Sequence, residues 1–250
     1  MRQVKARRRP VQLELLNKAG TGRADTRIGK RRGGRPLKGP RRAAPHRKRV
    51  QFKSYQPLHA VMRVLPEIGT LRQRLMYIAI RNASIVAARR SDARIVHISV
   101  QRTHIHLIVE AKDARALAKL MQGFQISAAK LINRAHSKLR DIEQRRRGRV
   151  FADRYHYEVI TSPRQMRNTL GYVLNNWRKH GEHKHPETHT WRIDPYSSAD
   201  QFAGWRGFDQ PPASPSAYPP MCVRPAATWL LREGWRRYGV IDCLEVPGDA

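Results

Sequence analysis

The stretch Arg94–Glu110, RIVHISVQRTHIHLIVE, decides the fold of this chain. It contains two runs rich in β-branched residues, RIVHISV and HIHLIVE, which are separated by only three polar residues. Two runs of this kind with a short polar connection predict an antiparallel β-hairpin. The sequence on either side of the hairpin indicates how the sheet continues and which helices cover it.

A strand and a helix are predicted before the hairpin. Residues 58–64, LHAVMRV, are mostly apolar over the length of a strand, and residues 71–88 carry apolar side chains at helical spacing. We expect the helix to bury one stripe of side chains, which comprises Leu71, Leu75, Ile78 and Ala79.

A second helix and another strand are predicted after the hairpin. Asp113 is suited to cap the N-terminus of a helix that runs to about Ala135. The apolar stripe of this helix comprises Leu117, Leu120, Met121, Phe124, Ala128, Leu131 and Ile132. Residues 149–161, RVFADRYHYEVIT, are most simply a strand.

A third helix completes the pattern. Ser162 is expected to be its N-cap, Pro163 its first residue and Gly181 the residue that ends it. The resulting order β, α, β, β, α, β, α predicts an α+β fold, with a ferredoxin-like antiparallel sheet and helices packed on it.

Composition divides the chain into three parts. Residues 1–52 are expected to form a disordered basic arm, because the first 50 residues contain 18 Lys or Arg and only two acidic residues. Residues 53–182 are expected to form the folded domain. Residues 183–250 are expected to form a Pro- and His-rich extension with a short amphipathic helix, whose Trp229, Leu230 and Trp235 dock onto the core.

The overall charge indicates a polyanionic partner. The chain has 50 Lys and Arg against 19 Asp and Glu, a formal net charge of +31. Nucleic acid is the usual partner of such a chain, because bound phosphates release condensed counterions. We expect no membrane span, since no apolar run approaches the roughly 20 residues required. The expected location is cytoplasmic and nucleoid-associated, with Cys222 and Cys243 reduced.

His104 and His106 form the first candidate site. They lie two residues apart on a predicted strand, so their side chains project from the same face while Ile105 points to the other. Two convergent imidazoles can bind a divalent metal through their neutral ring nitrogens. The alternative is a pair of hydrogen-bonded core histidines. The adjacent basic loop and the phosphate-binding composition favour the metal site.

Tyr172 and Asn176 form the second candidate site. They lie at i and i+4 on the third predicted helix, and therefore on one face of it. Tyr172 is the candidate nucleophile, and Asn176 would complete the metal site. Tyr155 and Tyr157 are rival nucleophiles, although their position on a strand makes them better candidates for packing. Tyr172 could also be a packing residue.

The stretch THIHLIVE, followed after a helix by FADRYHYEVITSPRQMRNTLGYVLNNWRKHG, resembles the IS200-like, REP-associated tyrosine transposases. These are Y1 members of the HUH endonucleases, and the resemblance covers roughly residues 57–181. It implies that residues 53–182 are the catalytic domain of a transposase, with His104, His106 and Asn176 as ligands of Mg²⁺ or Mn²⁺. Relatives often have Asn where this chain has Thr103 and Pro where it has Trp177.

The resemblance also implies a reaction and a substrate. Tyr172 would attack a phosphate of single-stranded or hairpin DNA, giving a 5′-phosphotyrosine and a free 3′-OH that allow cleavage and rejoining. Dimeric and monomeric relatives both exist, so a homodimer is possible. The expected phosphate contacts are Arg102, Lys130, Arg134, Arg145, Arg146, Arg147 and Arg149.

Two other functions are compatible with the same composition. A domesticated or non-catalytic nucleic-acid-binding protein would not need His104, His106 or Tyr172, and a metal-dependent nuclease would use water instead of the tyrosine. The second histidine-rich segment, KHGEHKHPETHT, places Lys184 inside its own His-x-His pattern and lacks strand periodicity. It is therefore expected to be a solvated loop.

Overall fold

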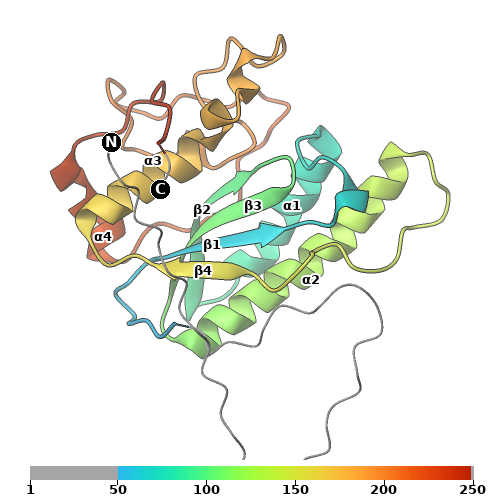
Figure 1. Ribbon diagram of the computed structural model, residues 1–250, viewed down its shortest axis with the longest axis horizontal. Helices are drawn as coiled ribbons and strands as arrows, with labels where there is room; N and C mark the ends of the chain where they lie inside the picture. Colours follow the sequence, from blue (N-terminus) through green and yellow to red (C-terminus); the bar gives the residue numbers. More distant parts are fainter. Residues whose placement is uncertain (1–49, 249–250) are drawn as a thin grey trace, which may run out of the picture. The chain divides into compact units, whose positions relative to one another are not determined.

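A computed structural model describes residues 50–248 (Figure 1), so the predicted basic arm lies almost entirely outside the described residues. One antiparallel sheet forms its centre, with the strand order β2-β3-β1-β4. The strands are β1 (Leu58–Arg63), β2 (Ala93–Val100), β3 (His104–Ala111) and β4 (His156–Val159). This order is that of a ferredoxin-like β-α-β-β-α-β unit, which confirms the predicted α+β fold and the hairpin formed by β2 and β3.

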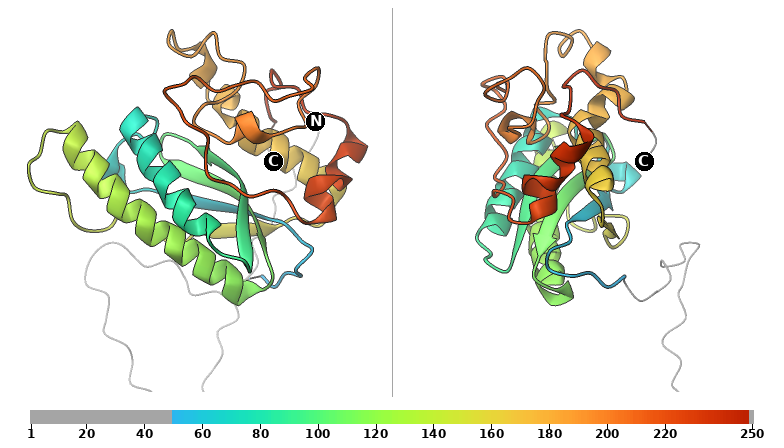
Figure 2. Two further views of the ribbon diagram at one scale, coloured as in Figure 1. Left: turned by 180° about the vertical axis from the view of Figure 1, so that it is seen from behind. Right: turned by 90° about the vertical axis from the view of Figure 1, so that its left-hand side faces the viewer.

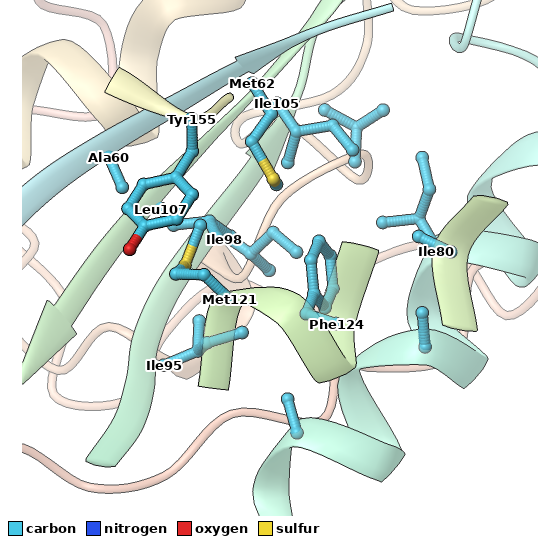
Figure 3. Close-up of a cluster of buried hydrophobic side chains, with 14 of the residues drawn as sticks. Ala60, Met62, Ile80, Ile95, Ile98, Ile105, Leu107, Met121, Phe124 and Tyr155 are labelled. Carbon is cyan, nitrogen blue, oxygen red and sulfur yellow. The ribbon is translucent and has the colours of Figure 1, made fainter. Parts of the chain in front are cut away.

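Helices cover both faces of the sheet. They are α1 (Arg74–Ala88), α2 (Ala114–Leu139) and α3 (Pro163–Lys179). Seen from behind in Figure 2, α1 and α2 cross one face of the sheet. The side chains on that face form a single apolar cluster with α1 and α2, part of which is drawn in Figure 3, while α3 packs in a separate cluster on the other face. None of the helices in the described part is both long and apolar enough to cross a membrane.

Local sequence signals account for the helix ends. The Asp113 carboxylate accepts a hydrogen bond from the Ala116 amide, and the Ser162 hydroxyl accepts one from the Gln165 amide. Both residues are therefore N-caps, as predicted. After α3 the chain turns at Gly181, whose φ of 71° lies in the left-handed region that favours glycine.

The buried faces of α1 and α2 differ from the predicted ones. In α1, Leu75 and Ile78 are only half-buried, whereas Met76, Tyr77 and Ile80 are buried. Leu71 is fully buried, although it precedes the helix. The segment LMYIAI is apolar on almost every side, so spacing alone could not select the face. In α2, Leu131 is half-buried and the other predicted stripe residues are buried.

The fourth strand is shorter than predicted. Of residues 149–161, only His156–Val159 pair as a strand with β1. Phe151 makes an isolated bridge to Val64, and a bend over residues 152–154 separates the two paired segments. The strand prediction was therefore right in place and wrong in length.

The C-terminal extension folds against the domain. Its short helices α4 (Trp229–Arg232) and η4 (Gly234–Tyr238) lie against α3, with Leu230 and Trp235 buried. Trp229 is 45% exposed, so its predicted docking is wrong. Both cysteines are free, and Cys243 is buried in the α3 cluster. The functional division at residue 183 stays a prediction.

A buried ion pair joins the extension to the segment that precedes α1. The guanidinium of Arg72 donates two hydrogen bonds of 2.9 Å to the carboxylate of Asp194, and the two side chains are 5% and 0% exposed. The same guanidinium donates to the carbonyl oxygen of Val100. Truncation of Asp194 would remove both charge-assisted hydrogen bonds from the buried guanidinium of Arg72 and leave it facing only the more distant carboxylate of Glu182, at 3.7 Å.

The Asp194→Ala variant should therefore lose roughly 3–5 kcal/mol of unfolding free energy. Urea titration followed by circular dichroism measures this loss. The control is Glu233→Ala, whose ion pair with Arg232 is exposed on both sides and should contribute less than about 1 kcal/mol. Equal unfolding free energies for the two variants would contradict a stabilising role of the extension.

Candidate active site

Three histidines project from the sheet face that α3 covers. On β3, His104 and His106 share this face, while Ile105 and Leu107 point into the α1/α2 cluster (Figure 3). On β1, His59 lies on the same side of the sheet as His106, whose ring it contacts. The sequence predicted the first two positions from the alternation of the strand. It gave no signal for His59, because a single histidine in an apolar strand has no local pattern.

His106 lies at the centre of a chain of hydrogen bonds. Its Nδ1 is 3.0 Å from Nε2 of His59, and its Nε2 is 2.9 Å from the side-chain nitrogen of Asn176. The ring of His104 is next to it, with 4.6 Å between ring centroids. His106 is 3% exposed and Asn176 is 0% exposed. The structure therefore brings the three predicted metal ligands together, from one strand and one helix.

Tyr172 lies beside this group on the preceding turn of α3. Its ring centroid is 5.3 Å from that of His106 and 6.0 Å from that of His59. The ammonium nitrogen of Lys179 is 5.4 Å from the centroid of the tyrosine ring. Tyr172 also lines a cavity of about 300 Å³, which opens between β1, β4 and the N-terminal half of α3. The candidate nucleophile is thus accessible and adjacent to the imidazole pair.

The electrostatic surroundings keep the imidazoles neutral. Burial, with further contributions from neighbouring imidazoles, lowers the pKa of His106 to about 2. Burial likewise lowers the pKa values of His59 and His104 to about 4. At neutral pH each ring is therefore uncharged. It carries one N–H, and its other nitrogen is unprotonated, as metal binding requires.

The residues present fit a divalent cation. The side-chain oxygen of Asn176 is buried and has no hydrogen-bond partner within the described chain, although a buried amide oxygen ordinarily has one. The amide nitrogen of the same side chain lies 2.9 Å from Nε2 of His106. Rotation of the buried amide would therefore turn its oxygen toward a cation bound at Nε2 of His106. Among residues 50–248, no group of three His, Cys, Asp or Glu side chains is arranged to hold a metal. The candidate set therefore depends on the amide.

The rival tyrosines lie on the wrong face. Tyr155 and Tyr157 are each 7% exposed and belong to the α1/α2 cluster, on the opposite side of the sheet from His106. Figure 3 shows Tyr155 among the side chains of that cluster. Neither can reach the group around His106 without unfolding the sheet.

Four of the seven predicted phosphate contacts line one cavity. Lys130, Arg145, Arg146 and Arg147 line a cavity of about 1220 Å³ between α2 and the segment that follows it. Arg134 and Arg149 do not line this cavity, and Arg149 donates to backbone carbonyls of Phe151 and Ala152. Arg102 lies elsewhere and is ion-paired with Glu182. That partner is distant in sequence, so the ion pair could not be predicted from the pattern.

Comparison with known proteins identifies a transposase family and similar solved structures. Residues 53–176 match the family model described as IS200-like transposase. A solved structure of a REP-associated tyrosine transposase bound to a REP hairpin is similar over 70% of this chain and 98% of that one, with 16% identity and a TM-score of 0.47. No curated protein matches the chain.

Proposed function

Because the chain belongs through residues 53–176 to the IS200-like transposase family, we propose that it cleaves and rejoins single-stranded DNA by transesterification at Tyr172. The observation that carries this proposal is the position of Tyr172, whose ring is 5.3 Å from that of His106, on the helix that also supplies Asn176. A nucleic-acid-binding protein without catalysis has no need of this arrangement.

The reaction is an exchange of phosphate esters. The Tyr172 oxygen forms a bond to phosphorus as the bond from phosphorus to the 3′ oxygen breaks. The phenol gives up its proton and the departing 3′ oxygen takes one up, so the products are a 5′-phosphotyrosine and a free 3′-OH. The phosphotyrosyl ester conserves the energy of the phosphodiester bond that was broken. A second 3′-OH can therefore reverse the step without a nucleotide cofactor.

Each group of the site has a part in this step. A divalent cation, Mg²⁺ or Mn²⁺, held by His104, His106 and Asn176 would stabilise the charge that develops on the phosphate oxygens. Helix α3 holds Tyr172 and Asn176 in one rigid element, so that the nucleophile and the amide keep a constant separation. Lys179 adds a positive charge beside the tyrosine ring.

A denaturing gel tests the proposal. The protein is incubated with labelled single-stranded oligonucleotides that contain DNA hairpins from the flanks of its own gene, with Mg²⁺, Mn²⁺ or EDTA. We expect a band of protein-linked DNA that requires the metal and disappears after protease treatment. Cut DNA without linked protein would instead indicate hydrolysis by water. DNA binding without either product, across the full set of flanking sequences, would indicate a binding protein.

We further propose that the basic cavity beside α2 contacts the DNA backbone. Lys130→Gln and Arg147→Gln should each weaken binding of a DNA hairpin and lower the slope of log K against log salt concentration by roughly 0.7–0.9. Fluorescence anisotropy at several salt concentrations measures this slope. The matched control is Lys119→Gln, since Lys119 is exposed on the same helix and lies outside the cavity. An equal effect at Lys119 would contradict a defined DNA path.

A further inference from the structure

We propose that His59 is a positioning residue that sets the tautomer of His106 and so directs the Nε2 lone pair of His106 toward the metal position. This inference rests on the proposed function for the identity of that position. The hydrogen bonds that support it are present in the metal-free protein, which allows a separate test.

The amide of Asn176 determines the direction of the hydrogen bonds. Its nitrogen can only donate, and it lies 2.9 Å from Nε2 of His106, so this ring nitrogen must accept. A neutral imidazole carries one N–H, which must then be at Nδ1. Nδ1 of His106 therefore donates to Nε2 of His59, 3.0 Å away. His59 in turn accepts at Nε2 and carries its own proton at Nδ1.

The ring of His59 also restricts the orientation of the His106 ring. The two rings lie edge to edge and nearly coplanar, with centroids 5.2 Å apart and an interplanar angle of 23°. The opposite edge of His106 meets Asn176, and Tyr172 packs against both histidines in edge-to-face contacts. Rotation of the His106 ring would break both of its hydrogen bonds, so the lone pair at Nε2 keeps one direction.

This arrangement matches the way in which proteins tune metal sites. A histidine ligand usually donates its second N–H to an outer group, which selects the ligating nitrogen, and loss of that outer group commonly lowers metal affinity 10–100-fold. The outer group is usually a carboxylate, a carbonyl or water. Here the imidazole of His59 fills this position, because its Nε2 lies 3.0 Å from Nδ1 of His106.

His156 provides a matched control. It lies on β4, next to β1, and contributes electrostatically to the lowered pKa of His59. Its side chain is 76% exposed and faces the carboxylate of Glu158 at 3.8 Å. A loss of metal affinity caused by removal of any nearby imidazole would appear in His156→Ala as well as in His59→Ala.

The experiment combines NMR with metal binding on the full-length protein. Long-range ¹H–¹⁵N spectra of the metal-free wild type should show His106 protonated at Nδ1, and His59→Ala should lose this single tautomer. Isothermal titration with Mn²⁺ should give an affinity 10–100-fold lower for His59→Ala and unchanged for His156→Ala. His59→Gln, whose side-chain oxygen can accept from Nδ1, should recover most of the affinity.

Two results would overturn the inference. One is a wild-type spectrum with His106 protonated at Nε2, which decides the question even if His59→Ala does not fold. The other is a folded His59→Ala protein with wild-type Mn²⁺ affinity. Neither measurement uses DNA, so they are independent of strand cleavage. Failure of the proposed function would appear separately, as a wild-type protein that binds Mn²⁺ but forms no DNA adduct.

Discussion

Replacement of Tyr172 by phenylalanine is expected to abolish covalent attachment of the protein to DNA, with a fall in rate of roughly 10⁴-fold or more. The reason is chemical: phenylalanine keeps the ring that packs against His59 and His106 but lacks the attacking oxygen. Folding and DNA binding should therefore be unchanged. The measurement is the rate of adduct formation on a denaturing gel, together with mass spectrometry of the DNA-linked peptide from the wild type.

The matched control for this prediction is Tyr157→Phe. The Tyr157 hydroxyl donates to the carbonyl oxygen of Val50, 2.6 Å away, on the face of the sheet remote from His106. Its removal should lower stability slightly and leave the rate of adduct formation at the wild-type level. An adduct that persists in Tyr172→Phe would rule out this nucleophile.

Loss of His104 is expected to have the second-largest effect. His104→Ala should lower the Mn²⁺ affinity by more than about 100-fold, because it removes one of the two imidazoles in the proposed ligand set. Loss of a group that only contacts a ligand already commonly costs about 10–100-fold in metal affinity. His104 is half-buried at the start of β3, so its truncation should leave the fold intact. Isothermal titration measures the affinity, and a Mn²⁺ titration of adduct formation should show activity partly restored at high concentration.

His185→Ala is the control for the metal prediction. His185 is exposed in the second histidine-rich segment, and it should contribute neither to Mn²⁺ affinity nor to the rate of adduct formation. If His185→Ala weakened Mn²⁺ binding as strongly as His104→Ala, the metal would have to be assigned to that segment.

The sequence predicted those parts of the fold that depend on local patterns. The hairpin followed from two β-branched runs, the caps at Asp113 and Ser162 from their side chains, and the shared face of His104 and His106 from strand alternation. Each of these depends on residues only a few positions apart. The i, i+4 spacing of Tyr172 and Asn176 belongs to the same class.

The features that escaped prediction depend on contacts between distant segments. His59 meets His106 only because β1 and β3 pair in one register, with Val61 opposite His106. Arg102 appeared to be a free cation because Glu182, which neutralises it, comes much later in the chain. In both cases the relevant partner is selected by packing, and no spacing in the sequence encodes it.

Backbone hydrogen bonds join the C-terminal extension to the outer edge of β2. The amide of Val100 donates to Tyr196, that of Ser198 donates to Ile98, and that of Arg224 donates to Ile95. These bonds occupy backbone groups along an outer strand, which would otherwise be available to a strand from another molecule. The β2 edge is thus protected against intermolecular pairing. If two copies of the chain were to join through a continuous sheet, they would have to do so at β4.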